Sequence, residues 1–262
     1  MLLFKRILNF RQSFFTRLRN KRRNERHAVA AGFPLRATIN LVGSDDPAVR
    51  RKAVPGSGRD WGGIVADLSG EGLRLRLPPA TTTGRGEKST LSLTLDDFAL
   101  RIPCTVAHFN VRSVEALCGL SLQFENDTQR KGYLQLLEAV VLGAGFAFDK
   151  EVKDPSGLHC ERYRSGGKNA VLTVWREKAE GRLYGFEMTV GEHCVRGDLG
   201  RATLQACASD EARTALPAGP MNREVILLYR IIAANLPKEL PADLRGKLQA
   251  LAKPSAPAGV RR

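Results

Sequence analysis

The first half of the chain alternates between apolar and polar positions in a series of short segments. In residues 34–42 every second side chain is apolar, which is the period of a β-strand that turns one face to a core. Short strands at close spacing are typical of a closed or nearly closed antiparallel β-barrel. The other segments with a strand-like pattern are 64–66, 73–77, 90–95, 98–110 and 116–124.

A helix is predicted directly after these strands. It begins at a cap formed by Asn126 or Asp127 and continues through Leu134 and Leu137 to Gly143. Between the first two strands, residues 43–62 are polar and rich in glycine and proline. We expect a long loop there, because such residues favour turns over regular elements.

The second half of the chain predicts a smaller α+β domain over residues 150–252, which follows the barrel in the sequence. Asp149–Gly157 is predicted as a linker, and residues 253–262, with two prolines and a glycine, as a disordered tail. The expected elements are a three-strand meander at 170–175, 183–190 and 194–196, and helices at 221–235 and 242–252.

Residues 2–19 predict a basic amphipathic helix. Its apolar side chains recur at spacings of three and four, and they are Leu3, Ile7, Phe10, Phe14 and Leu18. Two interpretations remain open. The apolar face could pack on the protein's own body, or the helix could lie on an acidic membrane surface or dock on a partner. Packing on the body is favoured, since each large apolar side chain costs about 1.5–3 kcal/mol to leave in water.

Charge is concentrated at the start of the chain. The 262 residues carry a net charge of +14, and residues 1–26 hold nine Lys or Arg and one Glu. A basic arm of this kind indicates an anionic partner such as a nucleotide, nucleic acid or acidic lipid. The five cysteines are scattered, which favours reduced thiols and a cytoplasmic protein over a disulfide framework. We expect no membrane span and no signal peptide.

Two short motifs carry the candidate chemistry. The first is Arg-x-x-x-Arg, with Arg22 and Arg26 at its ends, and the second is Asp-x-Ser-x-x-Gly, from Asp67 to Gly72. A guanidinium group can pair with phosphate oxygens or with guanine O6 and N7, and can stack on a base. A carboxylate only accepts, which suits the donating ring N–H and amino group of guanine. The alternative without a ligand is that the first motif is a basic surface linker and the second an ordinary turn.

The two motifs, in this order and each followed by a strand, resemble the signatures of the PilZ domain, a bacterial receptor for cyclic di-GMP. The resemblance covers about residues 20–145 and implies a six-stranded antiparallel barrel. One departure is His27, where family members often have an apolar residue. A basic residue before the first arginine would favour two stacked ligand molecules. The ligand-binding residues that the resemblance implies are Lys21, Arg22, Arg23, Arg26, Asp67, Ser69 and Gly72.

The sequence-based hypothesis is therefore a mainly β protein with flanking helices and a second, smaller α+β domain. Its parts are a helix at 1–19, a PilZ-like domain at 20–148, the α+β domain at 150–252 and a tail at 253–262. Binding of cyclic di-GMP would regulate conformation or partner contacts. We expect no catalysis, no cofactor and no metal, a downstream protein partner, and a cytoplasmic location with possible membrane contact through residues 2–19.

Two alternatives were weighed against this hypothesis. A basic nucleic-acid-binding protein would use the N-terminal arm and bind phosphates without sequence preference, but it leaves Asp67, Ser69 and Gly72 unexplained. A zinc site could be built from the dipeptides His159-Cys160 and His193-Cys194. Neighbouring residues on a strand point to opposite faces, so neither dipeptide has the spacing of a chelating loop.

Overall fold

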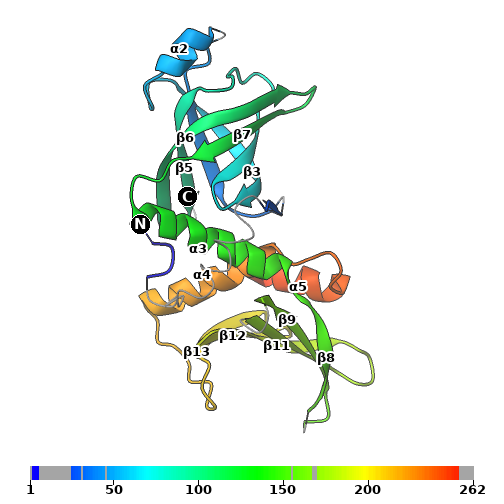
Figure 1. Ribbon diagram of the computed structural model, residues 1–262. Helices are drawn as coiled ribbons and strands as arrows, with labels where there is room; N and C mark the ends of the chain where they lie inside the picture. Colours follow the sequence, from blue (N-terminus) through cyan, green and yellow to red (C-terminus); the bar gives the residue numbers. More distant parts are fainter. Residues whose placement is uncertain are drawn as a thin grey trace, which may run out of the picture. The chain divides into compact units, whose positions relative to one another are not determined.

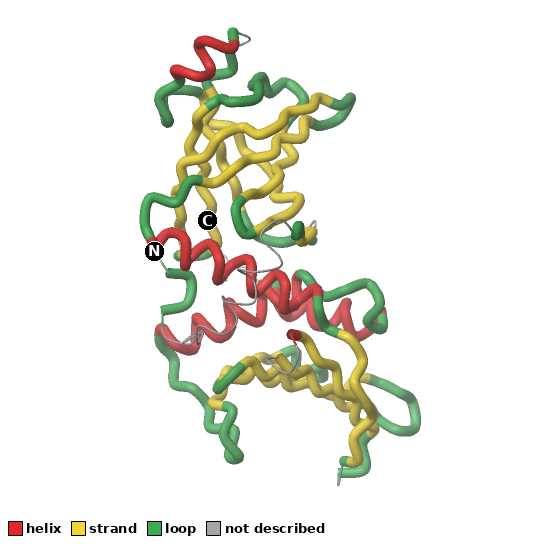
Figure 2. The backbone as a smooth tube through the Cα atoms, viewed as in Figure 1, coloured by secondary structure: helices red, strands yellow, loops and turns green. Residues whose placement is uncertain are grey.

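The computed structural model describes residues 2–5, 25–30, 32–44, 46–154, 156–166 and 170–253. The chain divides into two compact units, Met1–Glu138 and Ala139–Arg262. Both are built around antiparallel sheet (Figures 1 and 2). No helix among the described residues is long and apolar enough to cross a membrane.

Unit 1 is a closed six-stranded antiparallel barrel. Neighbouring strands follow the order β3-β2-β5-β6-β7-β4, and pairing of β3 with β4 closes the ring. A two-residue strand, β1 (His27–Ala28), pairs with the C-terminal end of β3, at Asp67 and Leu68. The barrel strands are β2 (Arg36–Leu41), β3 (Arg59–Ser69), β4 (Gly72–Leu77), β5 (Lys88–Leu95), β6 (Phe98–Val111) and β7 (Ala116–Leu122).

The alternating pattern of the sequence fills the barrel interior, so the barrel prediction is confirmed. In β2, β4 and β5 the apolar positions point inward and are buried, while most of the polar positions between them face out. The interior side chains include Leu35, Ile39, Leu41, Leu73, Leu75, Leu91, Leu93, Ile102 and Leu120.

The predicted loop at residues 43–62 is wrong in two places. A short helix, α2 (Pro47–Lys52), forms because Asp46 caps it, accepting a hydrogen bond of 2.7 Å from the Ala48 N–H. Strand β3 begins at Arg59, well before the expected residue 64. Its first half was hidden by the pair Gly62-Gly63, because glycine is rare within strands; a Cβ at Gly63 would lie 2.7 Å from Leu77 Cδ2.

The helix predicted after the barrel is α3 (Asp127–Ala144), which begins in unit 1 and ends in unit 2. Asn126 Oδ1 accepts the Gln129 N–H at 2.9 Å, and Gln129 Oε1 accepts the Glu125 N–H at 2.8 Å. These reciprocal bonds satisfy backbone donors that the first helical turn leaves open. The cap therefore lies at the predicted position.

The N-terminal residues that the structure describes are not helical, so the helix predicted for residues 2–19 does not begin at residue 2. Leu3 and Phe4 are buried, and both of their N–H groups donate to Gln135 Oε1, at 3.0 and 3.1 Å. Gln135 Nε2 donates back to the Phe4 carbonyl at 2.9 Å. The side-chain amide of Gln135, on α3, therefore forms hydrogen bonds with the backbone of this segment much as a neighbouring strand would. Residues 6–19 lie outside the described residues.

Unit 2 is a six-stranded antiparallel meander in which every strand pairs with its neighbours in sequence. The three predicted strands are present, and the sheet has three more. Its strands are β8 (Ala147–Lys153), β9 (His159–Ser165), β10 (Ala170–Arg176), β11 (Leu183–Val190), β12 (His193–Asp198) and β13 (Thr203–Ala208).

The linker predicted at Asp149–Gly157 is wrong, because β8 occupies its first half. This strand forms the edge of the sheet and carries four charged residues in seven. Charged side chains protect an edge strand from pairing with other chains, and the same charges gave the segment the composition of a linker. Residues 254–262 of the predicted tail lie outside the described residues.

Two helices cover one face of this sheet, at positions close to those predicted (Figure 1). They are α4 (Pro220–Ala234) and α5 (Ala242–Ala252). The ring of Tyr229 on α4 stacks on Phe186 of β11, with centroids 5.5 Å apart, and its hydroxyl donates to the Leu248 carbonyl of α5 at 2.9 Å. One residue thus joins both helices to the sheet.

Glu138, on α3, leads to a prediction about stability and pH. Its side chain is buried, neither carboxyl oxygen has a hydrogen-bond partner among the residues that the structure describes, and burial raises its pKa from 4.5 to about 9. The folded protein holds this proton between those values while the unfolded chain releases it, so unfolding free energy falls as pH rises from about 4.5 to 9. Glu138→Gln should remove that dependence and stabilise the protein at pH 8 by more than about 1.4 kcal/mol.

Thermal unfolding of parent and variant at pH 5 and pH 8 measures this effect. The exposed Glu180→Gln substitution is the matched control, since it removes the same charge from the surface. A Glu138→Gln protein that loses stability in parallel with the parent between the two pH values would contradict the assignment.

Candidate ligand-binding site

Asp67 lies at the centre of the site, near the end of β3. Short strand β1 pairs with it on one side, with Ala28 opposite Asp67, and strand β4 on the other, with Arg74 opposite. The Val29 N–H donates to the Ala66 carbonyl at 3.0 Å and continues the β1 pairing. This pairing brings Arg26, the last arginine of the first motif, beside the first residue of the second motif.

A β-bulge at Ala66 decides which way Asp67 points. Before the bulge Val65 lies opposite Leu75, and after it Asp67 lies opposite Arg74. Residues directly opposite each other share a face, and a bulge shifts that alternation by one residue. Without it, Asp67 would face the apolar interior together with Leu73. The extra residue places the carboxylate on the outer face of the barrel instead.

Two guanidinium groups hold the Asp67 carboxylate. Arg26 Nη1 lies 2.7 Å from Oδ1, and Arg74 Nη2 contacts Oδ2. The Asp67 side chain is 4% exposed, whereas those of Arg26 and Arg74 are 42% and 40% exposed. A buried carboxylate is costly unless it is paired, so the arginines are fixed by it. The cluster carries one negative and two positive charges, with the positive groups toward solvent.

The turn after Asp67 is closed by hydrogen bonds from two hydroxyl groups. Ser69 is buried, and its Oγ donates to the Gly72 carbonyl at 3.0 Å. The hydroxyl of Tyr133 on α3 lies 2.8 Å from the carbonyl oxygens of both Ser69 and Gly72. Burial raises the pKa of Tyr133, so the hydroxyl keeps its proton as a donor. These contacts tie α3 to the turn between β3 and β4.

Gly72 has a role in the backbone that the sequence did not show. It lies opposite Ser121 in the pairing of β4 with β7. A Cβ atom at this position would be 2.5 Å from the Leu120 carbonyl oxygen. No flexible side chain can move aside there, so the barrel requires a glycine at this position.

The structure therefore joins part of the predicted set and leaves part of it open. Arg26 and Asp67 are in contact, and Ser69 and Gly72 form the turn beside them. Lys21, Arg22 and Arg23 lie outside the described residues. Whether any of the seven binds a ligand stays a prediction.

Sequence reasoning missed Arg74 and Tyr133. The alternation of residues 73–77 already placed Arg74 on the outer face, but only the bulge puts Asp67 opposite it. Tyr133 lies 61 residues beyond Gly72 in the sequence and belongs to no motif, so no local pattern indicated that it closes the turn.

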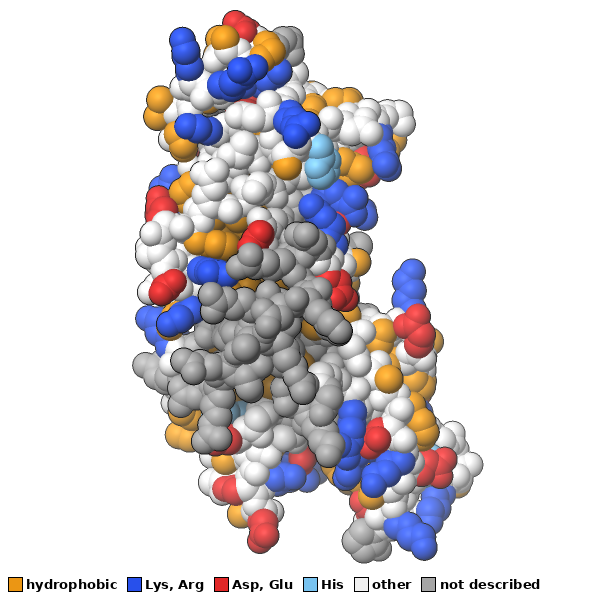
Figure 3. Space-filling view, viewed as in Figure 1, with side chains coloured by type: hydrophobic (Ala, Val, Ile, Leu, Met, Phe, Trp, Pro, Cys, Tyr) orange, Lys and Arg blue, Asp and Glu red, His pale blue; other side chains and the backbone are white. Residues whose placement is uncertain are grey.

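The site can bind an anionic, planar ligand. Two partly exposed guanidinium groups offer several N–H donors, and a carboxylate between them accepts from a donor edge. Other Lys and Arg side chains lie on the barrel, and they gather over α2, which carries Arg50, Arg51 and Lys52 (Figure 3). The general positive field of the unit favours an anionic ligand.

The two His-Cys dipeptides do not meet. His159 lies on β9, with Nε2 3.5 Å from Glu161 and 3.9 Å from Glu151. His193 lies on β12 opposite Ala208. Within the described ranges, no three His, Cys, Asp or Glu side chains are grouped to hold a metal ion.

Comparison with known proteins gives one family. The family model for the PilZ domain matches residues 20–143. None of the curated proteins matches the chain. Two solved structures are similar at low identity. The PilZ domain of CeSA from a cellulose synthesizing bacterium is 14% identical, with 44% of this chain and 97% of that chain covered and a TM-score of 0.31. Borreliella burgdorferi PlzA in complex with c-di-GMP is 12% identical, with coverage of 84% and 98% and a TM-score of 0.29.

Gly72→Ala tests the role of this glycine in the backbone. The added methyl group must push β4 away from β7, and we expect a loss of about 1–3 kcal/mol in unfolding free energy, the usual cost of overpacking. Gly62→Ala on β3 is the matched control, because its Cβ would have no neighbour within 4 Å. Urea unfolding followed by Trp61 fluorescence in a Trp175→Phe background reports on this barrel. A Gly72→Ala protein as stable as Gly62→Ala would show that the glycine serves something other than packing.

Proposed function

We propose that this protein is a receptor for cyclic di-GMP and regulates a partner when the ligand binds, because the family model for the PilZ domain matches residues 20–143. The observation that carries the proposal is the outward-facing Asp67 carboxylate held between Arg26 and Arg74. Cyclic di-GMP offers two phosphates and two guanines, which match guanidinium donors and a carboxylate acceptor.

The arrangement of the two arginines suggests how a ligand enters. Arg26 would turn from Asp67 to a phosphate or to guanine O6 and N7. Asp67 would then accept from the guanine ring N–H and amino group, and Ser69 and Gly72 would keep the turn in place. Arg74 stays on the other carboxylate oxygen throughout. The buried charge is therefore never left unpaired, an event that typically costs 3–5 kcal/mol.

Regulation would follow from the movement of Arg26. Strand β1 contains only His27 and Ala28, so the segment before it has a short attachment to the barrel. Closure of the basic stretch over a ligand would shift the population of that segment, by no more than the ligand's preference for the closed form. Unit 2 or residues 2–19 would deliver the output to a protein partner or a membrane surface.

The alternative of general nucleic-acid binding depends on the basic N-terminal arm, most of which lies outside the described residues. It makes a different prediction for salt. Phosphate contacts alone give affinity that falls steeply with salt and does not distinguish guanine from other bases.

Calorimetric titration of the full-length protein with cyclic di-GMP tests the proposal. We expect saturable binding with a dissociation constant of about 1 μM or lower, and a stoichiometry near two if the ligand binds as a stacked pair. GTP and cyclic GMP should bind more weakly. Absence of heat and of thermal stabilisation at about 100 μM ligand would overturn the proposal, because a ligand far above its dissociation constant must stabilise the native state.

Substitutions at the cluster should separate its members. Arg26→Ala should weaken cyclic di-GMP binding by about tenfold or more, the effect of losing a charge-assisted hydrogen bond worth roughly 1.5–3 kcal/mol. Asp67→Asn should weaken binding of guanine ligands. Arg76→Ala is the matched control, since Arg76 lies two residues beyond Arg74 on the same outer face and its nearest carboxylate is 3.9 Å away. Equal affinity of Arg26→Ala and Arg76→Ala would remove Arg26 from the site.

A further inference from the structure

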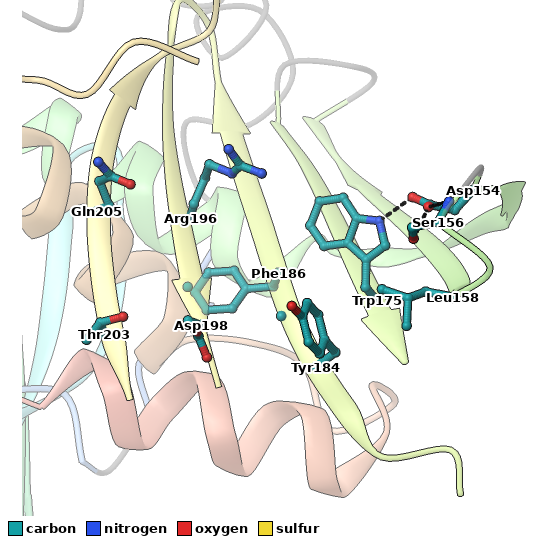
Figure 4. Close-up of a pocket in the computed structure, with 12 residues that line it drawn as sticks. Asp154, Ser156, Leu158, Trp175, Tyr184, Phe186, Arg196, Asp198, Thr203 and Gln205 are labelled. Carbon is teal, nitrogen blue, oxygen red and sulfur yellow. Dashed lines mark hydrogen bonds between the residues drawn. The ribbon is translucent and has the colours of Figure 1, made fainter. Parts of the chain in front are cut away.

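The open face of the sheet in unit 2 carries a second candidate binding site. A hollow of about 660 Å³ lies over β10, β11, β12 and β13, and Figure 4 shows the residues that line it. Its volume is in the range of small-molecule sites. The residues used below are Trp175, Tyr184, Gly185, Arg196, Asp154 and Gln205.

The hollow exists because a glycine interrupts a row of side chains. Trp175 lies opposite Gly185, and Gly185 lies opposite Asp198, so the three share one face across three strands. Gly185 leaves a gap between the indole and the carboxylate. The pairing of β10 with β11 shifts register beside it, where Trp175 pairs with Gly185 but Arg176 pairs with Leu183. The extra residue is Tyr184, and such a bulge places its side chain in the same hollow as Trp175.

The Trp175 ring is held in place. Its indole N–H donates to Asp154 Oδ2 at 2.7 Å, and the other carboxylate oxygen accepts the Ser156 N–H at 2.8 Å (Figure 4). Hydrogen bonds from Ser156 and Trp175 lower the pKa of Asp154, so it remains a charged acceptor. Tyr184 is 59% exposed, a large fraction for an aromatic side chain. A fixed indole beside an exposed phenol can stack on a planar ring.

The carboxylates that line the hollow are engaged by N–H groups other than those of the Arg196 guanidinium. Asp198 Oδ1 accepts the N–H groups of Gly200 and Arg201, both at 2.9 Å. Glu187 is held by Arg213, through Nε at 3.1 Å and Nη2 at 3.0 Å, whereas Arg196 Nε lies 3.6 Å from it.

The Arg196 guanidinium forms an ion pair with Glu187 at 3.6 Å, longer than a hydrogen bond, so it can also turn toward another acceptor. Its side chain is 50% exposed, and Gln205 lies opposite it on β13. The hollow thus combines stacking surfaces at one side with a cation and an amide at the other.

We propose that this hollow binds an aromatic anion of mononucleotide size, with the base on Trp175 and Tyr184 and the phosphate on Arg196 and Gln205. Aromatic side chains stack on any base, and arginine is suited to phosphate. The site lies wholly in unit 2 and is independent of the arginine cluster on the barrel.

Fluorescence of Trp175 tests the proposal directly. The chain has two tryptophans, so Trp61→Phe leaves Trp175 as the one reporter. Titration of full-length Trp61→Phe protein with AMP and with GMP should quench this fluorescence, with half-saturation below about 1 mM. Adenosine lacks the phosphate and ribose 5-phosphate lacks the ring, and each should bind about tenfold more weakly or worse. Quenching by cellobiose but not by AMP or GMP, or no quenching at all, would overturn the proposal.

Variants place the ligand and separate the two sites. Arg196→Ala should weaken AMP binding by about tenfold or more, and Glu187 keeps Arg213 as its partner in this variant. Arg201→Ala is the matched control, because it removes the same charge from an 83% exposed side chain that does not line the hollow. Tyr184→Ala should also weaken binding, whereas Arg26→Ala should not. Equal AMP affinity in Arg196→Ala and Arg201→Ala, or loss of AMP binding in Arg26→Ala, would contradict the assignment.

Discussion

The barrel site depends on one buried carboxylate. Asp67 is almost fully enclosed, and it is stable there because Arg26 and Arg74 approach its two oxygens from opposite sides. The carboxylate also determines where both arginines lie, since an uncompensated buried charge would cost several kcal/mol. Arg26 directly precedes the two-residue strand β1, and Arg74 lies on β4, on the other side of β3. A single acidic side chain therefore organises three segments of backbone and leaves a net positive surface.

Backbone irregularities position the functional candidates in both units. In the barrel, one extra residue in β3 moves Asp67 from the inner to the outer face. In the second sheet, an extra residue in β11 adds Tyr184 to the face that carries Trp175. A regular strand fixes the direction of each side chain by its parity. A bulge lets a polar or aromatic side chain point to the opposite face from the one that its position in the strand would give it. The apolar side chains on either side of the bulge still point into the core.

The sequence predicted the elements whose signal is local. Alternation in residues 35–41 and 73–77 and the cap at Asn126 depend on neighbouring side chains, and the structure confirms them. Strand β8 and the start of β3 were missed because their residue types are determined by contacts with residues distant in sequence or by their position at a sheet edge. The charges of an edge strand gave β8 the composition of a linker, and Gly63, which packs against Leu77, gave the start of β3 the composition of a loop. The same limit applies to the site: Arg26 and Asp67 belong to motifs, whereas Tyr133 and Arg74 join them only through tertiary packing.

The strand orders of the two sheets have a consequence for how the chain folds. In the second sheet every pairing joins strands that follow one another along the chain, so each hairpin can form as soon as its two strands exist. The barrel also needs the pairings of β2 with β5 and of β4 with β7, which join strands that are not consecutive in sequence. Its turn at Ser69 is held by the Ser69 hydroxyl and by Tyr133 of α3. Contacts between residues far apart in sequence slow folding, because loop-closure entropy must be lost first. During synthesis the barrel strands emerge early, but the contact that Tyr133 makes with the turn at Ser69 cannot form until α3 has emerged. Counted from the moment when all of its own residues have emerged, the N-terminal unit therefore takes longer than the C-terminal unit to form its full set of contacts. Its strand edges stay exposed during that time.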